Sequence, residues 1–262
     1  MNELTNPRIY GSPPYRYALI HGGPGAPGYM APVARELSKK FGVLEPLQTK
    51  DSINGQVDEL YDILKKHAEP PITLIGHSWG GFLSIIFTTQ YPEMVQKLIL
   101  ISSGPFEDKC VKLLKETRDK RLTEKEKIKT ISIENDLRKE NDEKNVRLLE
   151  RLGNLTSRAD SYHPIPSNSE VIEYNPEIFS KVWDEAVQMR SEGKFIDMIK
   201  NIKCPVIAIH GDYDPHPYEA VKEPFTKYVN NFRFKLLEKC GHYPWLEKFA
   251  KDKFYEVINE II

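Results

Sequence analysis

The sequence predicts an α/β fold with a mostly parallel sheet, and three observations lead to that expectation. Short runs rich in aliphatic and β-branched residues alternate with longer segments of helical periodicity. Most of these runs end at Gly, Ser, His or Asp, where the loops at the carboxyl ends of parallel strands hold ligands. The alternation stops once, between residues 106 and 201, and then resumes. We therefore expect one sheet, covered by helices on both faces and interrupted by a helical insertion.

The individual elements follow from this pattern. Six runs predict strands, and they are residues 17–20, 41–44, 72–75, 98–101, 206–209 and 232–237. Five segments predict helices, and they are residues 32–40, 54–67, 80–90, 218–229 and 245–261. The insertion is rich in Lys and Glu, as in KLLKETRDKRLTEKEKIK, and predicts several amphipathic helices. We divide the chain into an α/β core of residues 1–105 and 202–262 and a helical cap of residues 106–201.

The bulk composition argues against several classes of function. Lys and Arg number 37 against 38 Asp and Glu, and a net charge of -1 attracts neither nucleic acid nor an anionic membrane. No apolar run approaches the roughly 18 residues of a membrane span. The cysteines Cys110, Cys204 and Cys240 have the spacing of neither a zinc site nor a disulfide framework. Together with the absence of a signal-peptide pattern at the N-terminus, this predicts a cytoplasmic protein.

The stretch Gly76-His77-Ser78-Trp79-Gly80 joins a predicted strand to a predicted helix. Glycines on both sides of a serine allow a sharp turn in which neighbouring backbone passes without a Cβ clash. A serine on such a turn is typical of a nucleophile elbow. The alternative is a tight turn whose serine caps the helix. The apolar strand before it and the apolar helix after it favour Ser78 as a nucleophile.

A serine hydroxyl needs a base, and two histidines follow predicted strands. His242 lies in a Gly-His loop before the last helix, whereas His210 continues an apolar strand and fits a packed, hydrogen-bonded residue better. We therefore expect His242 to be the base. The other histidines are interpreted as mostly structural or surface residues, with His21 as an exception because of its loop; they are His21, His67, His77, His163 and His216.

The base needs an acid partner, and the loop after residue 209 offers two aspartates. Asp212 lies close to the strand end, where it can satisfy the backbone of a turn. Asp214 stands further into the loop, within reach of the next strand's histidine loop. We therefore expect Asp214 to be the acid.

An oxyanion hole requires backbone N–H groups directed at the developing charge. The glycine-rich loop His21-Gly22-Gly23-Pro24-Gly25 follows the first predicted strand and can supply one. The alternative is a simple Gly/Pro turn. We expect the N–H groups of Gly23 and Trp79 to form the pair.

These motifs resemble the α/β-hydrolase fold family, and HGGPG, GHSWGG, GDYD and GHYPWLE are similar to its proline iminopeptidase branch. The order Ser78, Asp214, His242 matches the order of that family. The resemblance covers roughly residues 15–105 and 205–262. It implies the same nucleophile, acid, base and oxyanion hole as the residues above, and it implies that the insertion is a cap.

Two departures from that branch affect the expectations. The family usually begins with a β-hairpin, and too few residues precede Tyr15 for one, so we expect about six strands without the N-terminal hairpin. The aminopeptidases of the branch bind the free amine of the substrate with glutamates near the cap. Cap glutamates such as Glu170, Glu173 and Glu177 lie in sequence that matches no motif of the branch.

The leading hypothesis is a serine hydrolase that cleaves a small ester or amide without a metal or organic cofactor. The candidate substrate-binding residues are His21 and, from the cap, Tyr162 and Trp183; Tyr174 and Phe179 are further possible pocket aromatics, although helix core is the more frequent role of such residues. One alternative is a proline iminopeptidase-like aminopeptidase with a peptide substrate. Another is a non-catalytic receptor for a small ligand on the same fold. The oligomeric state does not follow from the sequence.

Overall fold

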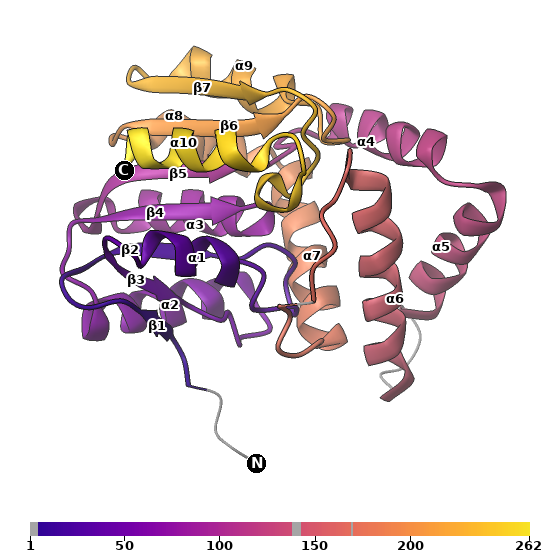
Figure 1. The fold of residues 1–262 in the computed structure, drawn as a ribbon, viewed down its shortest axis with the longest axis horizontal. Coiled ribbons are helices and arrows are strands. Elements are labelled where there is room, and N and C mark those ends of the chain that lie inside the picture. Colours follow the sequence, from indigo (N-terminus) through magenta and orange to yellow (C-terminus); the bar gives the residue numbers. More distant parts are fainter. Residues whose placement is uncertain (1–4, 138–142, 169) are drawn as a thin grey trace.

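A seven-stranded sheet runs through the centre of the molecule (Figure 1). The computed structural model describes residues 5–137, 143–168 and 170–262. The strand order is β1-β3-β2-β4-β5-β6-β7, and every neighbouring pair is parallel except β1 with β3. The strands are β1 Arg8–Tyr10, β2 Tyr15–Ile20, β3 Gly42–Glu45, β4 Ile72–His77, β5 Val95–Ile101, β6 Val206–Gly211 and β7 Phe232–Leu237. The expectation of a mostly parallel sheet is thus confirmed.

The expected number of about six strands is wrong, because β1 adds a short antiparallel strand at the edge of the sheet. Two side chains of β1 reach the buried carboxylate of Glu45 on β3. Arg8 Nε and Nη2 donate to Glu45 Oε2 at 2.9 and 2.6 Å, and the Tyr10 hydroxyl donates to the same oxygen at 2.8 Å. A strand of three residues is too short to produce a recognisable period in the sequence. Because β1 pairs with β3, it forms no hairpin with β2.

Helices cover both faces of this sheet (Figure 1). α1 and α10 pack on one face, and α2, α3, α8 and α9 pack on the other. The core helices are α1 Ala31–Leu37, α2 Ile53–His67, α3 Trp79–Gln90, α9 Glu219–Tyr228 and α10 Lys251–Ile261, with 3-10 turns η1 Pro92–Met94 and η2 Pro244–Leu246. The helix expected over residues 245–261 therefore begins only at Lys251, because η2 and the turn after it come first.

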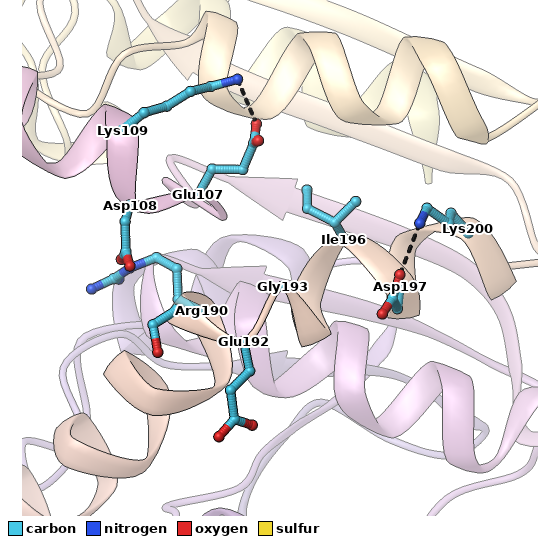
Figure 2. A pocket seen from close by; sticks show the side chains of 10 residues that line it. Glu107, Asp108, Lys109, Arg190, Glu192, Gly193, Ile196, Asp197 and Lys200 are labelled. Atoms are coloured by element: carbon cyan, nitrogen blue, oxygen red, sulfur yellow. Dashed lines mark hydrogen bonds and ion pairs between the residues drawn. The ribbon is translucent and has the colours of Figure 1, made fainter.

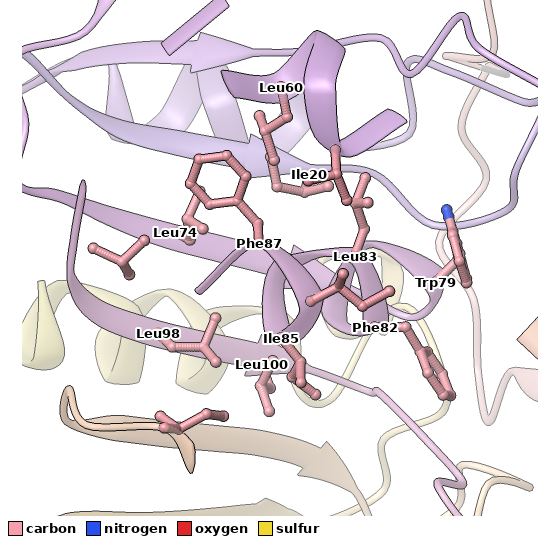
Figure 3. Close-up of a cluster of buried hydrophobic side chains, with 14 of the residues drawn as sticks. Ile20, Leu60, Leu74, Trp79, Phe82, Leu83, Ile85, Phe87, Leu98 and Leu100 are labelled. Atoms are coloured by element: carbon pink, nitrogen blue, oxygen red, sulfur yellow. The ribbon is translucent and has the colours of Figure 1, made fainter. Parts of the chain in front are cut away.

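The larger apolar cluster lies between the sheet and α3 (Figure 3). Leu74 on β4 and Leu98 on β5 face Phe87 of α3, and all three are fully buried. Truncating a large side chain in such a core costs roughly 3–5 kcal/mol. The packing therefore holds α3 rigidly against the sheet, and with it the turn that contains Ser78.

The insertion between β5 and β6 consists, in the described part of the chain, of five helices. They are α4 Asp108–Arg121, α5 Glu124–Leu137, α6 Glu143–Asp160, α7 Pro176–Ser191 and α8 Lys194–Asn201. Helices α4 to α7 lie beyond the carboxyl ends of the strands (Figure 1). Helix α8 packs against α3 instead, and its Phe195 and Ile199 belong to the core cluster. The helical insertion is confirmed, and the division of the chain into core and cap domains remains a prediction. Across the described residues, no helix is both long and apolar enough to cross a membrane.

Candidate active site

Ser78 lies at the turn from β4 into α3. Its φ of 51° and ψ of -118° belong to a region that residues other than glycine rarely occupy. The neighbouring glycines make this turn possible. A Cβ on Gly76 would lie 2.4 Å from the carbonyl oxygen of Gly80, and a Cβ on Gly80 would lie 2.0 Å from that of Ile20. A strained serine between a strand and a buried helix has the geometry of a nucleophile elbow, in which the hydroxyl stands clear of the backbone.

Asp214 and His242 meet in the loops that follow the neighbouring strands β6 and β7. His242 Nδ1 donates to Asp214 Oδ2 at 2.8 Å, and both side chains are buried. Burial alone would raise the pKa of Asp214, but His242, His216 and His210 outweigh it and hold that pKa well below its usual range. The carboxylate is therefore ionised at neutral pH. It keeps the His242 proton on Nδ1, which leaves the Nε2 lone pair available as a base.

Ser78 and His242 line one cavity of about 290 Å³. No hydrogen bond joins Ser78 Oγ to His242 among the described residues. Such bonds often form fully only once a substrate is bound. Most of the other large side chains around the cavity are apolar or aromatic, and they are Tyr29, Phe82, Leu114, Leu149, Leu152, Tyr174, Phe179, Trp183 and Tyr243. The nucleophile and base candidates thus face a space that suits a small, largely apolar ligand.

Two backbone N–H groups beside Ser78 lack an acceptor within the described residues, and they belong to Gly23 and Trp79. Gly23 lines the cavity and has a φ of 62°. Trp79 is the first residue of α3, so its N–H has no carbonyl one turn earlier in the helix. Both N–H groups are therefore free to bind an anionic oxygen that forms next to Ser78.

Comparison with known proteins identifies the family of this fold. A family model described as alpha/beta hydrolase fold matches residues 48–249. This chain belongs to the alpha/beta hydrolase fold family. The proline iminopeptidase of Lactobacillus helveticus (strain DPC 4571) is 25% identical over 282 residues, covering 92% of this chain and 87% of the relative.

Solved structures share the fold of this hydrolase. The crystal structure of VinJ aligns with a TM-score of 0.66 at 19% identity, covering 97% of this chain and 93% of VinJ. A structure reported with carboxylesterases of the thaumarchaeon Nitrososphaera gargenis aligns with a TM-score of 0.63 at 19% identity, covering 97% of this chain and 92% of that protein. These likenesses extend over nearly the whole chain, and they concern the fold alone.

The hydrolase cavity also contains charged side chains. Arg118 Nε and Nη2 donate to the two carboxylate oxygens of Asp160 at 2.8 and 2.6 Å, and Asp160 is buried. Arg190 Nε donates to Asp108 at 2.8 Å. Glu134 and Asp160 are the carboxylates among the described lining residues. The buried carboxylate of the cavity is therefore already engaged by an arginine.

The expected substrate-binding residues separate into two groups. Trp183 lines the cavity, as do the further aromatics Tyr174 and Phe179. Tyr162 does not line it. This residue is 43% exposed, and its ring packs against Tyr213 and Phe249.

His21 also lies outside the cavity lining. It is fully buried, and its Nε2 lies 2.9 Å from the carbonyl oxygen of Leu47. Its ring therefore connects two loops of the core instead of facing a ligand.

The other acidic and basic candidates of these loops have backbone partners. Asp212 Oδ1 accepts the Cys240 N–H at 3.2 Å, which is the turn-stabilising role weighed for it above. His210 Nε2 donates to the carbonyl of His216 at 2.9 Å. His77 Nε2 donates to the carbonyl of His242 at 2.9 Å. These three side chains thus stabilise the loops after β6 and β7 through hydrogen bonds to backbone groups.

His216 belongs to the site, although we interpreted it as a structural or surface residue. Its Nδ1 lies 2.7 Å from Asp214 Oδ1, and its ring lines the cavity. The available signal was its position two residues after Asp214, where an aspartate side chain commonly accepts the backbone N–H.

Donor atoms of Asp214, His216 and His242 lie within 4.8 Å of one another, close enough for one metal ion. Because the hydrogen bonds among them already engage the carboxylate, no ion is needed to explain the arrangement.

The insertion holds both loops of the site through backbone hydrogen bonds. The His242 N–H donates to the carbonyl of Asp160 at 2.9 Å. The Asn175 N–H donates to the carbonyl of Gly25 at 2.7 Å, in the loop that contains Gly23. The sequence carried no signal for these contacts, because they join segments far apart in the chain.

Two further hollows adjoin the insertion. One, of about 520 Å³, is lined by charged residues that pair with each other, such as Lys109 with Glu107 and Lys200 with Asp197 (Figure 2). It contains no histidine and no cysteine, and we assign it no function. The other, of about 760 Å³, lies between α5, α6 and α7 and shares Leu152, Phe179 and Trp183 with the active-site cavity. The shared side chains therefore form a wall between this groove and the cavity that Ser78 lines.

Proposed function

We propose that this alpha/beta hydrolase is a serine hydrolase that cleaves a small ester or amide through an acyl-enzyme on Ser78. The observation that carries the proposal is the 2.8 Å hydrogen bond from His242 to Asp214 at the cavity that Ser78 also lines. Nucleophile, base and acid come from three loops at the carboxyl ends of strands, where ligands of open α/β sheets bind.

In the first half-reaction, His242 Nε2 takes the hydroxyl proton while Ser78 Oγ attacks the substrate carbonyl carbon. The carbonyl π pair moves onto oxygen, and the N–H groups of Gly23 and Trp79 stabilise that oxyanion. When the tetrahedral intermediate collapses, His242 passes its proton to the leaving oxygen or nitrogen. The products are an alcohol or amine and an ester between Ser78 and the acyl group.

In the second half-reaction, His242 takes a proton from water, whose oxygen attacks the acyl carbon. Collapse of this intermediate breaks the bond to Ser78 Oγ, which recovers its proton from His242. A carboxylic acid leaves. Asp214 stays ionised throughout and stabilises the imidazolium that forms twice in each turnover.

The lining of the cavity supports a neutral acyl group over a free amine. An unpaired ammonium costs several kcal/mol or more when it is buried, so an amine site needs free carboxylates. Asp160 is engaged by Arg118, which leaves Glu134 as the remaining carboxylate of the described lining. Most of the other side chains in the lining are apolar or aromatic, and the remaining polar ones include Arg118, Arg190, Thr156, His216 and His242.

Aminopeptidase activity is the second candidate, because a relative named proline iminopeptidase matches 92% of the chain. The two candidates differ in how they respond to the substrate's amine. We would compare kcat/KM for prolyl and alanyl arylamides, free and N-acetylated, with that for short p-nitrophenyl esters. The ester hydrolase prefers the esters and tolerates acetylation, whereas a strong preference for free prolyl arylamide would establish the aminopeptidase.

The nucleophile is tested separately with a fluorophosphonate probe. Wild type and Ser180→Ala should be labelled, and Ser78→Ala should not. Ser180 is a suitable control because it lies in the neighbouring groove between α5, α6 and α7. A probe that binds without phosphonylating Ser78 would instead favour a non-catalytic ligand receptor.

The finer architecture belongs to the same proposal. We treat residues 106–201 as a cap that selects the substrate over a core of residues 1–105 and 202–262. Three free cysteines support a cytoplasmic location.

A further inference from the structure

We propose that His216 is a positioning residue of the triad, whose Nδ1–H holds the Asp214 carboxylate in the orientation that serves His242. This rests on the proposed function, because His242 is the base in that mechanism. His216 is neither nucleophile nor base in the reaction above. It acts through Asp214.

The carboxylate of Asp214 serves two imidazoles, one on each oxygen. Oδ1 accepts His216 Nδ1–H at 2.7 Å and the His216 backbone N–H at 3.0 Å. Oδ2 accepts His242 Nδ1–H at 2.8 Å. A rotation of the carboxylate about its Cβ–Cγ bond would break all three bonds. The His216 side chain therefore restrains the group that orients the base.

The two rings also lie against each other. Their centroids are 4.3 Å apart and their planes are 20° from parallel. Because each ring turns its Nδ1 toward Asp214, each turns its Nε2 away from that residue, and both rings line the cavity. The two rings thus present their Nδ1 donors to the same carboxylate, one to each oxygen.

The protonation state of His216 suits this role. Burial lowers its pKa to about 4, against the opposing attraction of Asp214. At neutral pH the ring is therefore uncharged, and next to an ionised carboxylate its single proton lies on Nδ1. A cation stacked on His242 would oppose the imidazolium that forms during catalysis. A neutral donor stabilises the carboxylate without that penalty.

A second buried histidine holds His216 itself. His210 Nε2 donates to the His216 carbonyl at 2.9 Å and lies 3.4 Å from Asp214 Oδ2. The bond from the His210 side chain to the His216 carbonyl thus joins the end of β6 to the loop that follows it. His210, His216 and His242 thus surround one carboxylate, although they come from β6 and from the loops after β6 and β7.

Two substitutions separate the Nδ1 donor from the ring. His216→Phe keeps a stacking ring and loses the donor, whereas His216→Asn loses the ring but places an amide N–H near the position of Nδ1. We expect His216→Phe to lower kcat by roughly 10–100-fold, the scale of a misplaced catalytic group, with little change in KM. Labelling of Ser78 by the fluorophosphonate should slow by the same factor. His216→Asn should stay close to wild type, as should His67→Asn, the matched control at the end of α2.

Thermal melts establish that each variant is folded. If His216→Phe does not fold, His216→Gln replaces it, because its amide lies near Nε2 and cannot reach Asp214 in the same way. The proposal is overturned if folded His216→Asn is as slow as the donor-free variant, or if the donor-free variant is as fast as wild type.

A readout independent of turnover distinguishes this inference from the proposed function. In protein with ¹⁵N-labelled histidine, NMR reports which ring nitrogen carries the proton. We expect His216 to be protonated on Nδ1, with a downfield N–H resonance that disappears in His216→Phe. Protonation on Nε2 would overturn the inference even if Ser78 reacts. If Ser78 neither reacts nor turns over substrate, the proposed function fails, and the NMR result still decides whether Asp214 binds both imidazoles.

Discussion

The buried carboxylate of Glu247, just after η2, accepts the backbone N–H of Tyr162 in the insertion at 2.7 Å. The same side chain accepts the N–H of His163 at 2.7 Å and that of Gly241 at 3.0 Å. One carboxylate thereby joins the insertion to the loop that contains His242.

Replacing Glu247 with Ala should therefore destabilise the protein strongly. Three backbone N–H groups would lose a charged acceptor, and we expect a loss of about 3 kcal/mol or more in the free energy of unfolding. Urea unfolding measures this. Glu256→Ala, which removes an exposed partner of Lys253 on α10, should cost at most about 1 kcal/mol. Equal losses for the two variants would show that Glu247 is not a structural link.

Asp214 and Asp212 should differ sharply in their effect on catalysis. Asp214→Asn removes the acceptor that sets the His242 tautomer, and we expect kcat to fall by roughly 10³–10⁴ with the fold retained. Asp212→Asn should do far less, since the described hydrogen bond of the Asp212 side chain is to the backbone N–H of Cys240. Steady-state kinetics with an activated ester distinguishes them, and a reversed order of the two effects would refute the assignment.

The turn at Ser78 should tolerate no side chain at residue 80. Gly80→Ala places its Cβ 2.0 Å from the backbone of Ile20, so we expect a loss of about 3 kcal/mol or more and no labelling of Ser78. Gly153→Ala is the matched control for stability, because its Cβ meets nothing within 4 Å. That change lies inside α6 and should stabilise the protein by up to about 1 kcal/mol. A stable, labelled Gly80→Ala variant would contradict the geometry of the turn.

Stability should fall as the solution becomes mildly acidic. Burial lowers the pKa of His21, His77, His210 and His216. In the unfolded chain a histidine titrates near about 6.5, so below that pH the unfolded state binds more protons than the folded state. The stabilisation is complete above about pH 6.5 and is lost as the pH falls toward the folded-state values.

His216 allows a quantitative check of that pH dependence. Its folded pKa of about 4 corresponds to a contribution of up to roughly 3 kcal/mol. Urea unfolding at several pH values between about 7 and about 4.5 should give a falling free energy of unfolding, with a shallower slope for His216→Asn. A constant free energy over this range would show that the histidines are not held neutral.

Much of the core was predictable because its signals are local. The strand before Ser78, the glycines around it and the apolar helix after it lie within twenty consecutive residues, and so the turn could be inferred from the sequence. The acid and base candidates likewise follow strands directly. They meet at 2.8 Å because neighbouring parallel strands end at the same edge of the sheet.

The features that were missed depend on contacts between distant segments. β1 is held by the side-chain hydrogen bonds of Arg8 and Tyr10 to Glu45. A strand of three residues is too short to show an alternating pattern in the sequence. Tyr162 was expected to line the pocket with its aromatic ring. In the structure, its backbone N–H instead donates to the Glu247 carboxylate, in the link between insertion and core. His216 is a different case: its partner Asp214 lies only two residues earlier, and the conformation of the loop after β6 decides that the two side chains meet.

Apart from the local bond from the Ile202 N–H to the Ile199 carbonyl at the end of α8, the backbone hydrogen bonds between insertion and core among the described residues come from a short part of the insertion, residues 160–175. These residues hold the loops of Gly23 and His242, whereas side chains of α5 and α7, with Lys115 of α4 and Leu152 of α6, line the groove. We therefore expect the two parts to tolerate exchange differently. A new substrate preference can arise by exchanging the outer helices, but a chimera that also replaced residues 160–175 would have to bring matching loops of the core with it.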